Sequence, residues 1–433
     1  MTILHQLRNM ILIVISAITI GTILMIAVYC LPTNRMYDNI RSSVEFMKLG
    51  ELPRWSKNVV HTSLDNFADV IILTKAVYPV ENVIESAMLN PSWSANAIPA
   101  KTFSEGFIKL IESDYRGIDE KPFIYPRYWH GYLVILKPML LIFKAEQLRV
   151  LNLYIQFLLT VTALVLLYKR LGIYYTYSFA IIILAINPIT TVLAFQHTNV
   201  YCIMLFTVIF ILLFNERLKQ NHRYIYFFMI IGIITAYFDL LTYPLVPLGV
   251  GLSLYIALNK ENFVEASKKS IIFQLFNKCF SWAFGYIGMW GGKVILATIL
   301  TSQNVILDAL NELYVRTSHH EGHGFDGEPI TIIRTFERNI NDFCEGPIKV
   351  ILILAFIYIL YLVFVKYKNK FILNKSIFTA FAFVFLLPFL WYTAACNHSF
   401  MHSHFTYREL SIAAFSLFAF IIESIPELKR IEN

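Results

Sequence analysis

MILIVISAITIGTILMIAVYCL, residues 10–31, is an apolar run of about 20 residues that contains no charged side chain. A helix of this length spans a hydrocarbon core of roughly 30 Å. The run IYYTYSFAIIILAINPITTVLAF, residues 173–195, has the same character, and further runs follow along the 433-residue chain. Because a soluble protein would not repeat this pattern so often, the sequence predicts an all-α, polytopic membrane protein.

The composition agrees with this class. Hydrophobic residues make up 57% of the chain and charged residues only 15%. The formal net charge of +7 comes from Lys and Arg that collect in short loops. We therefore expect the lipid bilayer, and not a nucleic acid, as the partner of these charges. The abundance of Lys, Ile and Phe suggests an AT-rich bacterial genome, and hence the bacterial plasma membrane as the location.

Charge alternation between the short loops predicts the topology. Loops rich in Lys and Arg are expected on the cytoplasmic side, together with both termini. The basic segments are YKRLG, NERLKQNHR, NKENFVEASKK, KYKNKFILNK and the tail ELKRIEN. The loops FQHTN, DLLTYP and CNHSFMHSHFTY contain neither Lys nor Arg and are expected outside. The ten expected spans are residues 10–31, 149–168, 173–194, 199–214, 223–241, 245–258, 271–299, 348–366, 372–394 and 408–424.

The first apolar run is expected to remain as an anchor. Its apolar core is longer than that of a secretory signal peptide, and no small-x-small cleavage site follows it. The segment GYLVILKPMLLIF, residues 131–143, is apolar but short, with Lys137 and Pro138 in its middle. If it crossed the membrane, the charge bias of every later loop would invert. We therefore expect a re-entrant or interfacial helix.

Two long outer loops follow from this topology, at residues 32–148 and 300–347. The first is long enough to form a folded cap on a single membrane domain of residues 1–433. Within it, residues 33–55 have the pattern of an amphipathic helix that lies on the membrane.

Polar and titratable residues concentrate on the predicted outer side. Nine of the 11 histidines fall there. These are His61, His130, His197, His319, His320, His323, His398, His402 and His404. The five cysteines show no zinc or redox spacing. Packing within the membrane explains them, although Cys344 and Cys396 could face outside and pair. We therefore expect function at the outer boundary of the membrane.

The motif LDNFAD places Asp65 and Asp69 four residues apart. On a helix both carboxylates share one face, and like charges there are destabilising. Three interpretations remain open. Asp65 could cap a helix on a solvated face, or it could act as a general base tuned by the second carboxylate. The pair could also bind a divalent cation.

The motif YPRYWHGY carries Arg127 and His130 beside three aromatic residues. Anchoring at the membrane interface explains the aromatic rings. Arg127 and His130 suit a phosphate or a sugar at the interface. The motif FQHTN contains His197, and such a short connection needs polar side chains only for substrate contact or helix capping.

The segment SHHEGHGFDGEP, residues 318–329, combines histidines and carboxylates with glycines. A metal site, a substrate-gating loop and a solvated loop are all compatible with this composition, and no HExxH helix is present.

The turn NHSFMHSHFTYRE brings His398 and His402 close to Tyr407 and Arg408. Arg408 could snorkel to the interface, but with its neighbours it also forms a plausible anion clamp. Lys293 follows two glycines within an apolar run, so it is either a snorkelling side chain or a site residue. Two interpretations are likewise open for Asp239 in YFDLLTYP, a helix cap or a site residue.

The pattern of anchor helix, long loop with an interfacial helix, and acidic motif within that loop resembles the GT-C class of integral-membrane glycosyltransferases. This resemblance covers the topology of most of the chain. It implies transfer of a sugar from a polyprenyl-phosphate donor to a glycan or glycolipid acceptor on the outer side. Two features differ from the class. The acidic motif lies over thirty residues past the first helix, and YWHGY is not proline-rich.

The resemblance implies roles for individual residues. Asp65 would be the base, and Asp69 an orienting or metal-binding residue. The residues expected to bind phosphate or sugar are Arg127, His130, His197, Asp239, Lys293, His398, His402, Tyr407 and Arg408. The expectation includes no certain cofactor, only a possible divalent cation.

Two other functions remain open. A membrane polysaccharide polymerase or ligase would depend on outer arginine and histidine side chains instead of a carboxylate base. A transporter or flippase for a lipid-linked substrate would place charged or broken helices near the membrane midplane.

Overall fold

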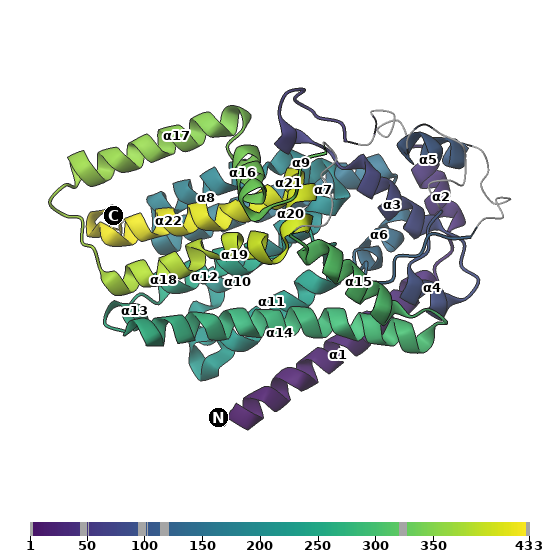
Figure 1. Ribbon diagram of the computed structural model, residues 1–433, viewed down its shortest axis with the longest axis horizontal. Coiled ribbons are helices and arrows are strands. Elements are labelled where there is room, and N and C mark those ends of the chain that lie inside the picture. The colour runs from purple at the N-terminus through teal and green to yellow at the C-terminus, as the bar shows by residue number, and fades with distance from the viewer. Residues whose placement is uncertain are drawn as a thin grey trace.

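The computed structural model describes residues 3–43, 50, 52–93, 101, 103–112, 121–319 and 327–429. Within these ranges the regular secondary structure is helical, and the only β-type pairings are two isolated bridges, Arg54 with Ser63 and Ser92 with Phe123. Figure 1 shows long helices packed side by side, with several short helices gathered at one end. The all-α class predicted from the sequence is confirmed.

Seven helical ranges of the described chain are long and apolar enough to cross a membrane. They contain α1 (Ile3–Tyr29), α7 (Ala145–Leu171), α10 (Phe195–Lys219) with α11 (Arg223–Phe238), α14 (Lys268–Leu300), α17 (Gly346–Tyr361), α18 (Lys375–Phe385) with α19 (Leu387–Ala394), and α22 (Leu410–Ser424). Two shorter apolar helices are α8 (Ile173–Ile186) and α12 (Val246–Leu258). Every range predicted to span thus contains a helix, while the number of ten crossings stays a prediction.

The remaining elements are short. Five of them, called the cap here, lie together at the right of Figure 1: α2 (Asn34–Arg41), α3 (Asn66–Val77), α4 (Val83–Leu89), α5 (Phe103–Glu112) and α6 (Leu133–Leu140). The others are α9 (Pro188–Leu193), α13 (Glu261–Val264), α15 (Val305–Thr317), α16 (Ile332–Phe343), α20 (Cys396–Met401), α21 (Ser403–Thr406), the 3-10 turns η2 (Val60–Thr62), η4 (Gln220–His222), η6 (Tyr407–Glu409) and η7 (Pro426–Lys429), and the π-helical turn η5 (Leu362–Lys366). The chain ends marked in Figure 1 lie away from the cap.

Small residues let the central helices approach closely. The turn Gln220–His222 joins α10 to α11, and α11 packs along α14. A Cβ atom built on Gly232 of α11 would lie 2.1 Å from the carbonyl oxygen of Trp282, and one on Gly285 of α14 would lie 2.2 Å from that of Met229. Because apolar side chains gain little from leaving lipid, such backbone contact is a main source of helix packing in membranes.

One apolar core lies among α8, α10, α11, α12, α14, α18 and α22. A second joins α1, α11 and α14 to the cap. The cap is therefore packed onto the helical bundle through its own apolar face. This packing fixes the position of the loops that connect the cap helices.

Two predictions fall in the cap. Among the described residues of 33–55, the amphipathic pattern forms the eight-residue helix α2, whose buried residues (Met36, Tyr37 and Ile40) pack against α3, α5 and α6. That this helix lies on the membrane stays a prediction. Residues 44–49 and 51 lie outside the described residues. Helix α6 has 8 residues, about 12 Å at 1.5 Å per residue, which is too short to span a membrane.

Candidate active site

The turn that contains His398 to Arg408 forms one wall of the candidate site. It folds as α20, α21 and η6, directly before α22. Helix α16 supports it from behind, because the Asn339 side chain donates to the Ser399 carbonyl oxygen at 2.9 Å and accepts from the Thr406 hydroxyl at 2.8 Å. The wall is thus a fixed part of the fold.

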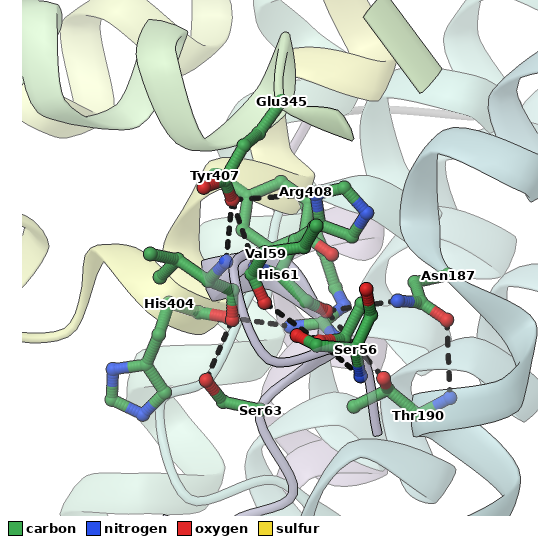
Figure 2. Close-up of polar contacts among 12 residues, drawn as sticks. Ser56, Val59, His61, Ser63, Asn187, Thr190, Glu345, His404, Tyr407 and Arg408 are labelled. Atoms are coloured by element: carbon green, nitrogen blue, oxygen red, sulfur yellow. Dashed lines mark hydrogen bonds and ion pairs between the residues drawn. The ribbon is translucent and has the colours of Figure 1, made fainter. Parts of the chain in front are cut away.

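The loop around η2 forms the opposite wall (Figure 2). The Glu345 carboxylate accepts the Val60 backbone N–H at 2.5 Å, and the Asn187 side chain donates to the His61 carbonyl oxygen at 2.9 Å. These contacts hold the loop against the start of α17 and the junction of α8 and α9. The loop leads directly into Asp65.

Asp65 joins the two walls. Its Oδ1 accepts the Ala68 backbone N–H at 2.9 Å, which caps the N-terminus of α3. Its Oδ2 lies 3.7 Å from Nε2 of His404 in the opposite wall. The helix-capping interpretation of Asp65 is therefore confirmed for one oxygen, and the second oxygen faces the site.

Arg408 is a fully buried cation. Its Nε donates to the Ile186 carbonyl oxygen at 2.8 Å, and its guanidinium carbon lies 4.8 Å from the Tyr407 ring centre. Its Nη2 has no hydrogen-bond partner among the described residues. Among the described residues no carboxylate pairs with Arg408. A buried charge without a counter-ion is strongly unfavourable, so an anion bound here would stabilise the protein.

His197 is fully buried at the start of α10. Its ring centre lies 5.8 Å from that of Phe405, and Arg408 and His404 lie close to it. Within the described chain, neither His197 ring nitrogen nor Nε2 of His404 has a hydrogen-bond partner. Since buried polar groups in native proteins are nearly always satisfied, this group of nitrogen atoms indicates a polar ligand.

Two other histidines of the walls are neutral at physiological pH. Burial, with a further effect of the Arg408 charge, lowers the pKa of His61 to about 4. Burial and the neighbouring His404 lower the pKa of His402 to about 3. The His402 ring stacks on Phe405 with ring centres 5.1 Å apart. His402 therefore contributes an aromatic ring to its wall, because a neutral imidazole does not supply the positive charge of an anion clamp.

His398 lies beside His402, with ring centres 4.9 Å apart, but its ring nitrogens bond elsewhere. Its Nδ1 contacts Nη1 of Arg316, and its Nε2 lies 2.7 Å from the Leu241 carbonyl oxygen. Both ring nitrogens are thus engaged, and burial keeps the pKa of His398 well below its usual value. His398 holds the wall to α15, and its predicted contact with substrate stays a prediction.

Asp69 has a different environment from Asp65. Its Oδ2 pairs with Nη2 of Arg149 at 3.0 Å, and its Oδ1 accepts the Gln196 backbone N–H at 3.4 Å. Burial raises the pKa of Asp69 to about 6, although the Arg149 charge acts in the opposite direction. These contacts favour the orienting role over the metal role. Among the described residues, no group of three or more His, Cys, Asp or Glu could hold a metal ion.

The other predicted site residues are held in separate contacts. Arg127 pairs with Asp308 at 2.8 Å and with Glu312 at 3.5 Å. The ring nitrogens of His130 contact the Tyr132 hydroxyl at 2.8 Å and the Tyr125 carbonyl oxygen at 3.0 Å. These residues join the cap to α15, so the structure does not bring them to the Asp65–Arg408 group.

Lys293 and Asp239 also lie in separate contacts. Lys293 is buried and donates to the Ala87 and Met88 carbonyl oxygens at 3.0 and 2.8 Å, at the C-terminus of α4. The Asp239 carboxylate accepts both the backbone N–H and the hydroxyl of Thr242. The Asp239 carboxylate thus closes the turn that follows α11, and its two interpretations, a helix cap or a site residue, stay predictions. Lys293 has no snorkelling geometry, because its side chain is buried.

Sequence analysis missed several residues of the site. Arg149, Asp342 and Glu345 were not proposed, and His61 and His404 were noted only as outer histidines. Asp342 lies close to Glu345 and His404, and burial raises its pKa. Isolated charges beside apolar runs are the signal that could have indicated Arg149 and Glu345. Their partners come from distant segments, which a single sequence does not reveal.

Two further predictions concern the segment SHHEGHGFDGEP and the pair Cys344 and Cys396. Residues 320–326 of SHHEGHGFDGEP, with most of its histidines and carboxylates, lie outside the described residues. All five cysteines are free, so Cys344 and Cys396 do not form a disulfide.

Comparison with known proteins gives no relative. No model of a protein family, no curated protein and no solved structure matches the chain.

Proposed function

We propose that this protein is a membrane glycosyltransferase. It moves a sugar from a polyprenyl-phosphate donor to a glycan or glycolipid acceptor of the cell envelope. The observation that carries the proposal is the group of Arg408, His197 and His404. Arg408 Nη2, both His197 ring nitrogens and His404 Nε2 have no hydrogen-bond partner among the described residues, and the Asp65 carboxylate lies 3.7 Å from His404 Nε2. Such a group suits an anionic leaving group on one side and a proton acceptor on the other.

Each step of the reaction has a residue in the proposal. Asp65 removes the proton from an acceptor hydroxyl, whose oxygen attacks the anomeric carbon of the donor sugar. The bond between that carbon and the phosphate oxygen breaks, and polyprenyl phosphate leaves. Arg408 and His197 donate hydrogen bonds to the phosphate as its charge develops. Asp69 holds Arg149 and so orients the start of α3, at which Asp65 lies.

The position of the site in the fold supports the same class of reaction. The site lies where α8, α17 and α22 begin or end, next to the cap (Figures 1 and 2). A lipid-linked sugar needs such a place, because its phosphate lies at the headgroup level and its tail lies in the membrane. The resemblance to the GT-C class extends the proposal to the extracytoplasmic side of a bacterial plasma membrane, with both termini cytoplasmic.

A transfer assay tests the proposal. Purified protein in lipid is incubated with a panel of radiolabelled polyprenyl-phosphate sugars, and release of polyprenyl phosphate or sugar is followed. We expect turnover with at least one donor and its loss in Asp65→Asn and in Arg408→Lys. The matched control is Asp308→Asn, which alters an ion pair outside the site and retains turnover.

Other outcomes would favour the alternative functions. Dependence on Arg408 and His402 without dependence on Asp65 or Asp69 would favour a polysaccharide polymerase or ligase. Folded wild-type protein that turns over no donor but moves a lipid-linked sugar between leaflets would favour a transporter.

A further inference from the structure

Helix α15 carries an exposed apolar stripe on its outer face. Four large apolar side chains at positions i, i+1, i+4 and i+7 of this 13-residue helix share that face. Their exposed fractions lie between 42% and 55%, and the residues are Ile306, Leu307, Leu310 and Leu313. The apolar stripe of a surface helix normally packs on the protein core. An exposed stripe of this kind indicates a surface that binds an apolar partner.

The charged side chains of α15 are turned towards the cap and the candidate site instead. Asp308 pairs with Arg127 at 2.8 Å, and Glu312 pairs with Arg316 at 2.8 Å and with Arg127 at 3.5 Å. Arg316 also contacts His398 in the wall of the site. The helix is thus polar towards the protein and apolar towards its surroundings. A helix that faces water has the opposite arrangement.

The stripe continues the lipid-facing surface of α14. This helix is long and apolar enough to cross a membrane, and its side chains Ile295 and Ile299 are 51% and 70% exposed. Only residues 301–304 separate its end from α15. The Ile306 backbone N–H donates to the Thr298 hydroxyl at 3.1 Å, so the stripe begins beside the last turn of α14. Figure 1 shows α15 turning back from that end towards α20.

The length of α15 is incompatible with a membrane crossing. Its 13 residues rise about 20 Å, less than the roughly 30 Å of a hydrocarbon core. A short helix with one apolar face lies in the plane of the membrane surface, with that face among the acyl chains. We infer that α15 docks on the lipid bilayer through its apolar stripe. The continuity with α14 makes lipid the partner, and the inference does not depend on the proposed sugar transfer.

Docking of α15 holds the candidate site at the boundary between lipid and water. The inner face of the same helix binds Arg127, which precedes the cap helix α6, and contacts His398 in the wall of the site. The membrane, the cap and the wall are therefore joined by one helix, which sets the level of the site relative to the bilayer.

Photocrosslinking identifies what covers the stripe. p-Benzoylphenylalanine replaces Leu310 in the full chain, which is reconstituted in phosphatidylglycerol liposomes, irradiated and analysed by intact mass and gel electrophoresis. We expect an adduct with the mass of one phosphatidylglycerol. The positive control is the same replacement of Ile287 in α14, which is 62% exposed. The negative control is Lys109 on the cap helix α5, where the lipid adduct should be at least about tenfold weaker.

The attachment point on the lipid distinguishes docking from immersion. Ile287 lies about 20 Å before the end of α14 at the helical rise, and hence deeper in the membrane than α15. Fragmentation of the adducts should place the label from position 310 nearer to the glycerol than the label from position 287. Equal depths would contradict a helix in the plane of the surface.

Three other results would overturn the inference. One is the lack of a lipid adduct at position 310 while position 287 is labelled. Another is a crosslinked dimer, which would make a second copy of this chain the partner. The third is a crosslink to another segment of the same chain, found by peptide mapping. If the variant at Leu310 does not fold, replacement of Leu307 repeats the test on the same stripe.

Discussion

Asp65 and Asp69 lie four residues apart on one segment, yet their surroundings give them different roles. Asp69 forms a buried ion pair with Arg149, whereas Asp65 caps α3 with one oxygen and faces His404 with the other. Removing one partner of a buried pair leaves an uncompensated charge, which destabilises a protein strongly. Asn at the cap position is as favourable as Asp. Stability and activity should therefore separate between the two residues.

We predict that Asp69→Asn lowers the free energy of unfolding by about 3 kcal/mol, whereas Asp65→Asn lowers it by less than about 1 kcal/mol. Thermal denaturation in detergent measures both. The double variant Asp69→Asn with Arg149→Leu should regain most of the lost stability, since it removes both charges. Equal destabilisation by the two single variants would contradict this division of roles.

His61 makes stability depend on pH. Its pKa falls from the usual 6.5 to about 4, so between these values the unfolded chain binds a proton that the folded protein does not. Stability from this group is complete above pH 6.5 and is lost as the pH falls towards 4. Between pH 7 and pH 4 the free energy of unfolding falls, and we predict that His61→Gln makes this fall smaller by about 2 kcal/mol. Denaturation curves from pH 7 to pH 4 measure the difference, and identical pH profiles would reject the role.

Residue type alone was enough to indicate the two walls of the site. Carboxylates, histidines and Arg408 between apolar runs are costly to bury, so their presence indicated function or pairing. The sequence could not distinguish these two outcomes. Arg127 and Lys293 carry the same charge as Arg408. Arg127 pairs with two carboxylates, and Lys293 donates to carbonyl oxygens at a helix end, whereas Arg408 Nη2 lacks a hydrogen-bond partner among the described residues. Only the contacts separate the three.

At the scale of elements, α4 ends at two buried lysines. Lys293 donates to the Ala87 and Met88 carbonyl oxygens, and Lys75 donates to that of Asn90 at 2.6 Å. These carbonyl groups belong to the last turn of α4 and have few partners within the helix. Cations there also interact favourably with the helix dipole. The two lysines thus tie α3, α4 and α14 together.

We predict that Lys293→Met lowers the free energy of unfolding by about 2 kcal/mol, because it leaves buried carbonyl groups unsatisfied. The KM for the donor should stay within twofold of the wild-type value. Thermal denaturation and steady-state kinetics measure the two effects. A tenfold rise in KM with unchanged stability would instead support the phosphate-binding role expected from the sequence.

The contact of α11 with α14 allows a matched pair of glycine variants. Gly232→Ala would place a Cβ atom 2.1 Å from the Trp282 carbonyl oxygen, whereas no atom lies within 4 Å of a Cβ atom built on Gly291. We predict that Gly232→Ala destabilises the protein by about 2 kcal/mol. Gly291→Ala should stabilise it by up to about 1 kcal/mol, because Ala favours the helix. Equal melting temperatures would contradict the close helix contact.

The elements themselves could largely be predicted, because apolar length determines membrane helices. All ten predicted ranges contain helices. For α2, the sequence predicted a helix that lies on the membrane. An amphipathic pattern requires an apolar neighbour and does not specify which one, and here α3, α5 and α6 supply it.

For the whole molecule, the fold brings a buried cation and a carboxylate to one site. Arg408 donates to the Ile186 carbonyl oxygen at the end of α8, and His404, four residues before Arg408, faces Asp65. The cation and the carboxylate suit a phosphate and an acceptor hydroxyl. This arrangement depends on contacts between segments more than 200 residues apart, such as Arg408 with Ile186 and Val60 with Glu345, so sequence patterns alone could not provide it.

The central claim is that Asp65 and Arg408 act on one bound donor. The most direct test is a double-variant cycle on kcat/KM for sugar transfer, with Asp65→Asn, Arg408→Lys and the combination. Each single variant should lose about 100-fold or more. The combination should lose no more than about tenfold beyond the worse single variant, because residues that act on one transition state are not additive. Losses that multiply, or full activity in either single variant, would contradict a shared site.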